Sequence, residues 1–141
     1  MLNNSEKIFV DTSAFNALLD RSNQHHKEAS NLWPDLLNKT ILLVTTNYVV
    51  SDTLRLLQSN IGFDTSKLWY RDIIDVFNLL WVDEGSHQRA YELWLNLGHS
   101  RIRFVDCVSL IIMRKHQIKK VFCFNSYFTK QGFEKFSAKA I

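Results

Sequence analysis

The sequence predicts an α/β fold in which helices cover both faces of a parallel β-sheet. Short, almost wholly apolar runs recur along the 141 residues, and longer segments with helical periodicity separate them. Strands that alternate with helices favour a parallel sheet, and an uninterrupted apolar run is typical of a strand buried on both faces. One proline, four glycines and no linker-like stretch predict that residues 1–141 form a single domain.

The apolar runs locate the strands, and capping residues mark where the helices between them begin. We expect buried strands at residues 7–10, 41–44, 79–82 and 121–124, with a further short strand near 138–141. We expect helices at residues 12–20, 23–37, 47–59, 64–77, 86–97 and 104–115. Thr12 or Ser13 can cap the first of these helices, and Pro34 should kink or shorten the second.

Composition excludes several classes of protein. No apolar run reaches the roughly 18–20 residues that a membrane-spanning helix needs. Residues 1–11 lack the basic start and the apolar stretch of a signal peptide, so we expect a cytoplasmic protein with no membrane partner. Cys107 and Cys123 form no CxxC motif and have no matching histidine pair, which disfavours a zinc site. In a reducing compartment we expect both as core residues rather than as a disulfide.

Charge is distributed unevenly between the two ends of the chain. Residues 1–100 carry 8 Lys/Arg and 12 Asp/Glu, whereas residues 101–141 carry 9 Lys/Arg and 2 Asp/Glu. A basic segment of this kind indicates a polyanionic partner such as a nucleic acid, although a solvated basic end would look the same.

Three of the 14 acids occupy positions that are unusual for surface carboxylates. Asp11 directly follows the first apolar run, at the carboxyl end of a strand, where parallel sheets bind ligands. Asp52 shares a helical face with Tyr48, Val49 and Leu56, and Asp106 lies in the first turn of an almost wholly apolar helix. Each also has a plain structural interpretation: a helix cap for Asp11, a rim carboxylate for Asp52, and a helix-dipole interaction for Asp106.

Together these three acids predict a metal site. Carboxylates that converge at one sheet edge repel one another unless a cation lies between them. Ligands that are all oxygen favour Mg²⁺ or Mn²⁺ over zinc, and a common reaction of such ions is phosphodiester hydrolysis by an activated water.

Four blocks of the sequence resemble the PIN domain family, and within it the VapC-like toxins of bacterial toxin–antitoxin pairs. They occur in the order of the family and cover nearly the whole chain: FVDTSAF at 9–15, TTNYVVSDTL at 45–54, FVDCVSLIIM at 104–113 and VFCFNSYFTKQGF at 121–133. The resemblance implies a three-layer α/β/α sandwich around a parallel sheet of about five strands. It also implies an endoribonuclease that depends on Mg²⁺ or Mn²⁺.

The resemblance assigns site residues one by one. Asp11 and Asp106 fall on the first and third family acids and would hold the metal directly. Asp52 falls on the second, which is usually Glu, and would complete the metal site or orient the attacking water. Asn125 falls on the fourth, usually Asp, and would be a neutral ligand or a positioner of water. Arg103 stands near the place of a small hydroxyl residue that often precedes the third acid.

The resemblance also implies partners. These are an RNA substrate whose phosphates basic residues of the 101–139 segment would contact, a small antitoxin protein, and a second copy of the chain in a homodimer. Apolar residues of the early helices, including Leu32, Trp33 and Leu36, would supply part of the antitoxin groove or of the homodimer face.

Two other functions compete with the ribonuclease. The first is a PIN-like module that binds RNA or protein but has lost turnover through the Asn125 change. The second is another metal-dependent phosphotransfer enzyme, such as a phosphatase with an aspartyl nucleophile. Such enzymes usually carry a second acid two residues after the first, and the presence of Ser13 at that position counts against this function.

Overall fold

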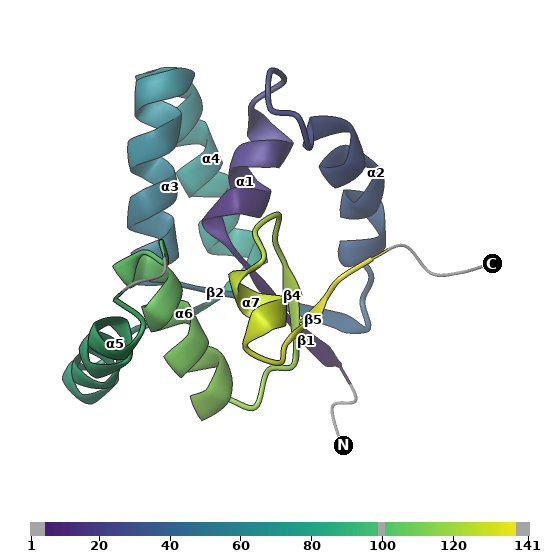
Figure 1. Cartoon of the computed structure of the whole chain (residues 1–141). Helices are drawn as coiled ribbons and strands as arrows, with labels where there is room; N and C mark the ends of the chain where they lie inside the picture. The colour runs from purple at the N-terminus through teal and green to yellow at the C-terminus, as the bar shows by residue number, and fades with distance from the viewer. Residues whose placement is uncertain (1–4, 99–100, 138–141) are drawn as a thin grey trace.

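Five parallel strands form the sheet at the centre of the computed structural model, which describes residues 5–98 and 101–137 (Figure 1). The strands are β1 (Glu6–Val10), β2 (Ile41–Thr46), β3 (Asn78–Leu80), β4 (Lys120–Phe122) and β5 (Glu134–Lys135). They lie in the order β3-β2-β1-β4-β5, and every neighbouring pair is parallel. The predicted strand near 138–141 lies outside the described residues. The fifth strand instead comes a few residues earlier.

Seven helices accompany the sheet in the part of the chain that the structure describes. They are α1 (Thr12–Leu19), α2 (His26–Leu36), α3 (Asn47–Asn60), α4 (Phe63–Val76), α5 (Glu84–Asn96), α6 (Phe104–Lys115) and α7 (Tyr127–Lys130). The first six correspond to the predicted helices, and α6 has the predicted bounds. Pro34 lies inside α2, which runs through this residue and ends two residues later at Leu36. None of the described helices is long and apolar enough to span a bilayer.

The strand order creates a crevice at the carboxyl edge of the sheet. The chain proceeds outward from β1 to β2 and β3, and then returns to place β4 on the other side of β1. Because such crossovers are almost always right-handed, this reversal sends the later helices to the opposite face. β1 and β4 lie side by side with Val10 opposite Phe122, so the segments that follow these two strands leave the sheet together. Ligands of open α/β sheets bind at such a switch point.

Apolar residues bury the sheet on both faces, as the uninterrupted runs predicted. Ile8, Phe9 and Val10 of β1 have no exposed surface, which suits the central strand of a covered sheet. Cys107 and Cys123 are free and buried, which confirms their prediction as core residues.

The early helices expose less apolar surface than predicted. In α2, Leu32 is 5% exposed and Leu36 is fully buried, because both pack into the core. They are therefore unavailable to a partner. Trp33 is only partly buried and its ring stacks on Phe77, with ring centroids 6.4 Å apart.

The buried face of α3 is also displaced from the predicted one. It consists of Val49, Val50, Thr53 and Leu57, so Asp52 lies at its edge rather than within it. The Thr46 hydroxyl accepts a hydrogen bond from the Val49 amide at 3.1 Å and caps this helix. The cap fixes where α3 begins, and therefore the direction in which Asp52 projects.

Candidate active site

Asp11 is held rigidly where β1 passes into α1. It is the N-cap of α1, in place of the predicted Thr12 or Ser13, and only 1% of its surface is exposed. Its Oδ2 accepts hydrogen bonds from the Ser13 amide at 3.1 Å and from the Ser13 hydroxyl at 2.6 Å. Its Oδ1 is buried and has no hydrogen-bond partner among the described residues. One carboxylate oxygen is therefore held by two donors from Ser13, and the other keeps its lone pairs open.

The segment after β4 completes this side of the site. The Phe124 amide donates to the Ser13 hydroxyl at 2.9 Å, so Ser13 connects the ends of β1 and β4. Asn125 Nδ2 donates to Asp11 Oδ2 at 3.1 Å. Asn125 Oδ1 accepts from the Tyr127 amide at 3.1 Å. Because an amide N–H needs an oxygen acceptor, this bond holds the Asn125 nitrogen, and not its oxygen, toward Asp11.

Asp106 approaches from the first turn of α6. It is 1% exposed, and its Oδ2 accepts a hydrogen bond from the backbone amide of Arg103 at 3.1 Å. Arg103 is the N-cap residue of α6 and Asp106 is the third residue of the helix, so this hydrogen bond is the half of a capping box in which the N3 side chain accepts from the N-cap amide. Asp106 Oδ1 is buried without a hydrogen-bond partner, as Asp11 Oδ1 is.

Asp52 reaches the site from α3, where two arginines pair with it. Arg55 Nη2 donates to Asp52 Oδ1 at 3.0 Å, and Arg103 Nη2 lies 2.9 Å from Asp52 Oδ2. The Asp52 side chain is 12% exposed. Asp11, Asp52 and Asp106 are here called the acid cluster: Asp11 lies between β1 and α1, Asp52 lies in α3, and Asp106 lies in the first turn of α6.

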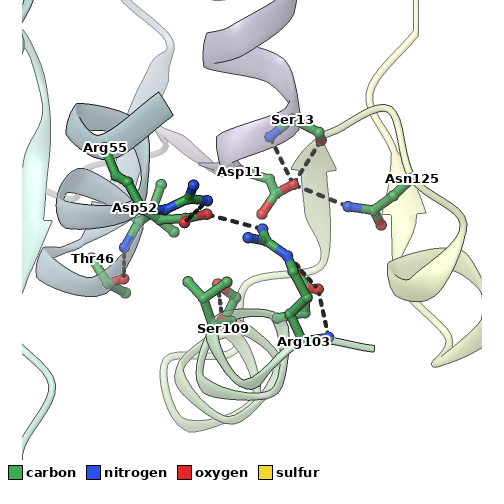
Figure 2. A network of polar contacts seen from close by, with 11 residues as sticks. Asp11, Ser13, Thr46, Asp52, Arg55, Arg103, Ser109 and Asn125 are labelled. Atoms are coloured by element: carbon green, nitrogen blue, oxygen red, sulfur yellow. Dashed lines mark hydrogen bonds and ion pairs between the residues drawn. The ribbon is translucent and has the colours of Figure 1, made fainter. Parts of the chain in front are cut away.

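Arg103 lies within the acid cluster. Figure 2 shows its guanidinium rising from the start of α6 into the space between Asp52 and Asp11. Its Nε is 3.7 Å from Asp106 Oδ2, so one guanidinium bridges two of the three acids. The sequence showed only that Arg103 lies three residues before Asp106, and the resemblance placed it near the position of a small hydroxyl residue. Neither observation predicted that it turns into the site.

Burial and pairing move the pKa values of the three acids in different directions. Burial raises the pKa of Asp11, although hydrogen bonds from Ser13 partly oppose it. Burial also raises the pKa of Asp106 to about 6, and the charge of Asp11 adds to this shift. Burial alone would raise the pKa of Asp52, but contacts with Arg103 and Arg55 outweigh it and lower the pKa below its usual value. Asp11 and Asp106 therefore favour a further positive charge beside them.

The donor set fits a hard divalent cation at two of the three acids. The free Oδ1 atoms of Asp11 and Asp106 are buried oxygens with open lone pairs. Mg²⁺ commonly binds one or two carboxylates and keeps several waters. Within the described ranges, however, no three His, Cys, Asp or Glu side chains form a group ready to hold a metal. Asp52 stands apart from the other two acids because its oxygens carry the arginines.

The basic carboxyl-terminal segment is partly engaged in ion pairs away from the acid cluster. Lys115 Nζ lies 2.9 Å from Asp83 Oδ2, and Lys120 Nζ lies 2.8 Å from Glu6 Oε2. These pairs reduce the positive charge available to a polyanion. The charge imbalance of the sequence therefore overstates the free basic surface.

Comparison of the sequence with known proteins identifies one family. A model of the PIN domain matches residues 8–134. The 23S rRNA-specific endonuclease VapC20 of Mycobacterium tuberculosis (strain ATCC 25618 / H37Rv) is 28% identical over 127 residues, which are 89% of this chain and 95% of that protein.

Solved structures confirm the predicted α/β/α fold. The crystal structure of M. tuberculosis VapC20, a Sarcin-Ricin loop cleaving toxin, is similar with a TM-score of 0.84 and 27% identity, over 93% of this chain and 99% of that one. VapBC2 from Rickettsia felis, solved with a DNA fragment from the promoter, has a TM-score of 0.69 at 9% identity, over 94% of this chain and 99% of that one. At that identity the likeness concerns the fold alone.

Replacement of Ser13 should destabilise the site while all three acids stay in place. In Ser13→Ala the Phe124 amide and Asp11 Oδ2 each lose a hydrogen-bond partner, which should lower the free energy of unfolding by about 1–3 kcal/mol. Ser13→Thr keeps the hydroxyl and should lose less. Urea unfolding of both variants measures the difference. Equal stability of Ser13→Ala and the unmodified protein would show that this hydroxyl does not join the two strand ends.

Proposed function

Because the chain belongs to the PIN domain family, we propose that it is an endoribonuclease and the toxin of a toxin–antitoxin pair. The observation that carries the proposal is the burial of Asp11 and Asp106 at the carboxyl edge of the sheet, with Arg103 in contact with both Asp106 and Asp52. The similarity to a 23S rRNA-specific endonuclease along most of both chains supports RNA as the substrate.

In this proposal Asp11 and Asp106 hold a Mg²⁺ or Mn²⁺ ion through their free Oδ1 atoms. When bound, the ion supplies an activated water and stabilises the charge that develops on the scissile phosphate. Asp52 is the third acid of the site, and in the structure it pairs with Arg55 and Arg103. Asn125 acts on the metal site through Asp11, because its amide nitrogen holds Oδ2 in place.

A groove beside Asp52 suits the RNA strand. It has a volume of about 410 Å³ and is lined by Asn47, Tyr48, Ser51, Asp52 and Arg55. The Arg55 side chain is 62% exposed, so its guanidinium can contact a phosphate while it stays paired with Asp52. We propose that Arg55 positions the backbone of the RNA and does not read its sequence.

A second groove suits the antitoxin that the resemblance implies. It has a volume of about 480 Å³ and lies among α1, α2 and α4. Most of the residues that line it are apolar: Phe15, Leu18, Leu19, Trp33, Leu37, Trp69, Ile73, Val76 and Phe77. An apolar groove of this kind accepts one face of an amphipathic helix. We propose this antitoxin groove as the docking site. The implied homodimer and the single-domain organisation of residues 1–141 stay predictions.

The alternative function is a PIN-fold module that binds RNA without cutting it. Two observations favour it: Asn125 brings no charge to the site, and Arg103 already pairs with Asp52 and Asp106. Both reduce the negative charge that would attract a metal ion. A binding module would hold RNA equally well with and without a divalent metal.

Removal of either metal-binding acid should abolish cleavage. Asp11→Asn and Asp106→Asn keep the shape of the side chain but remove a charged ligand, so we expect cleavage to fall by about 100-fold or more. Asp83→Asn is the matched control, because Asp83 pairs with Lys115 on the surface. The measurement is cleavage of purified ribosomal RNA with Mn²⁺ and with EDTA. Undiminished cleavage in EDTA contradicts the metal mechanism, and RNA binding without cleavage favours the alternative.

A charge in the antitoxin groove should prevent binding of the antitoxin. Leu37 lines the groove and is 53% exposed, so Leu37→Glu should fold normally and expose a charge to the apolar partner. Leu95→Glu is the matched control, because Leu95 is 55% exposed on α5. Each variant is coexpressed with the product of the adjacent reading frame, and the copurified amount is measured. Equal recovery with both variants would place the docking site elsewhere.

Restoring an acid at position 125 should strengthen the metal site. Asn125→Asp adds a carboxylate 3.1 Å from Asp11 Oδ2, and a divalent ion gains attraction that exceeds the added repulsion between the acids. We expect tighter metal binding and faster cleavage. Asn96→Asp, at an exposed residue of α5, adds the same charge away from the site. Cleavage rates are measured against Mg²⁺ and Mn²⁺ concentration. Superimposable curves for Asn125→Asp and the unmodified protein would place residue 125 outside the working site.

A further inference from the structure

The cation at the acid cluster belongs to the chain itself. The guanidinium of Arg103 lies 2.9 Å from Asp52 and 3.7 Å from Asp106, and Figure 2 shows it directed toward Asp11. Asp106 Oδ2 accepts a hydrogen bond from the backbone amide of Arg103, and it also lies near the guanidinium of the same residue. Arg103 therefore supplies positive charge to two of the acids, and Arg55 adds a second guanidinium at Asp52.

Arg103 and a divalent ion would compete for the same carboxylates. An ion bound between Asp11 and Asp106 would lie close to the guanidinium, and two cations that share the same carboxylates repel each other. Each also draws on the same negative charge, so binding of one weakens binding of the other. This coupling is reciprocal, as any linkage between two binding events must be.

Arg103 can leave the acid cluster without disturbing the core. Its side chain is 47% exposed, and its backbone has an ordinary extended conformation at the start of α6, with φ −87° and ψ 160°. A turn of the side chain toward solvent would release Asp52 Oδ2 and relieve Asp106 Oδ2 of a competing contact. The helix would keep the hydrogen bond from the Arg103 amide to Asp106, because that bond belongs to the backbone.

We infer that Arg103 is a tethered cation that competes with the divalent metal for Asp52 and Asp106 and so sets the metal affinity of the site. A metal ion held by Asp11 and Asp106 would favour an outward turn of Arg103, which would release Asp52 Oδ2. The inference rests on the proposed function, because it takes the acid cluster as the metal site. It concerns binding alone, and it can be tested without RNA.

The experiment is a calorimetric titration of the full chain with Mn²⁺. Arg103→Ser removes the competing charge, and we expect the affinity to rise by about tenfold or more, within the usual range of coupling between sites. Arg101→Ser is the matched control: Arg101 is exposed, lies two residues away, and makes no ion pair with an acid of the described residues. Its affinity should stay within about twofold of that of the unmodified protein, because it does not contact the acids.

A second variant and a second readout protect the test against misfolding. Arg103→Gln keeps most of the side-chain length, should also tighten Mn²⁺ binding, and replaces Arg103→Ser if that variant does not fold. Thermal unfolding should show a lower midpoint for either variant in EDTA, where the acids lose their counter-charge, and a larger rise on addition of Mn²⁺. Adding Asp106→Asn to Arg103→Ser should remove the gain in affinity.

The outcomes separate this inference from the proposed function. If the unmodified protein binds Mn²⁺ and neither Arg103 variant binds it more tightly, Arg103 does not compete and the inference is wrong, while the metal-dependent nuclease stands. If no variant binds Mn²⁺, the metal dependence of the proposed function fails and the inference fails with it. Tighter binding by Arg101→Ser as well would show a general charge effect and would overturn the role of Arg103.

Discussion

Burying carboxylates beside one another is unfavourable unless positive charge or hydrogen-bond donors accompany them, and this constraint organises the whole carboxyl edge of the sheet. Asp11 and Asp106 are each 1% exposed. The structure compensates them differently. Asp11 receives neutral donors from Ser13 and Asn125, whereas Asp106 receives a backbone amide and the nearby guanidinium of Arg103. In the part of the chain that the structure describes, each acid keeps one oxygen without a hydrogen-bond partner, and in the proposed function these two oxygens hold the cation.

The resemblance to the PIN pattern implies three departures, and two of them lower repulsion in the site. Asp52 would stand in place of the usual Glu and is one methylene shorter. Arg103 would stand near the place of a small residue, and its guanidinium lies 2.9 Å from Asp52 and 3.7 Å from Asp106. Asn125 would stand in place of an acid, and its amide nitrogen donates to Asp11, where a carboxylate would repel it. We propose that the contacts of Arg103 and Asn125 stabilise the site without a metal.

The sequence allowed the sheet and most helices to be predicted, because their signals are local. Buried strands appear as apolar runs, and α6 begins where an extended residue precedes a long apolar helix. The strand Glu134–Lys135 was not predicted, since two charged residues at a sheet edge have no apolar pattern. The four-residue helix Tyr127–Lys130 was not predicted either, because one turn is too short for a periodicity to appear.

The acids of the candidate site could be predicted from the sequence, but the contacts between them could not. Asp11 and Asp106 were distinguished by their position at element boundaries: Asp11 is the N-cap of α1, and Asp106 lies in the first turn of α6. Asp52 was predicted to lie on the apolar face of α3, but the face that is buried in the structure lies to one side of it. Which face of α3 is buried depends on how the helix is rotated against its neighbours, and the sequence does not show this rotation. The turn of Arg103 into the site depends on two acids from different helices. Such a contact between distant segments leaves no local pattern in the sequence.

The two sides of the site differ in rigidity, and this difference determines where it can change. Asp11 is tied through Ser13 to the Phe124 amide, and Asn125 is itself fixed by the Tyr127 amide, so this side follows the paired ends of β1 and β4. On the other side, Asp52 is held by two arginine side chains that are 62% and 47% exposed. Exposed ion pairs contribute little to stability and rearrange readily. A cation that enters the site therefore meets a fixed ligand at Asp11 and adjustable partners at Asp52, so the rearrangement that admits it falls on Arg103 and not on the sheet.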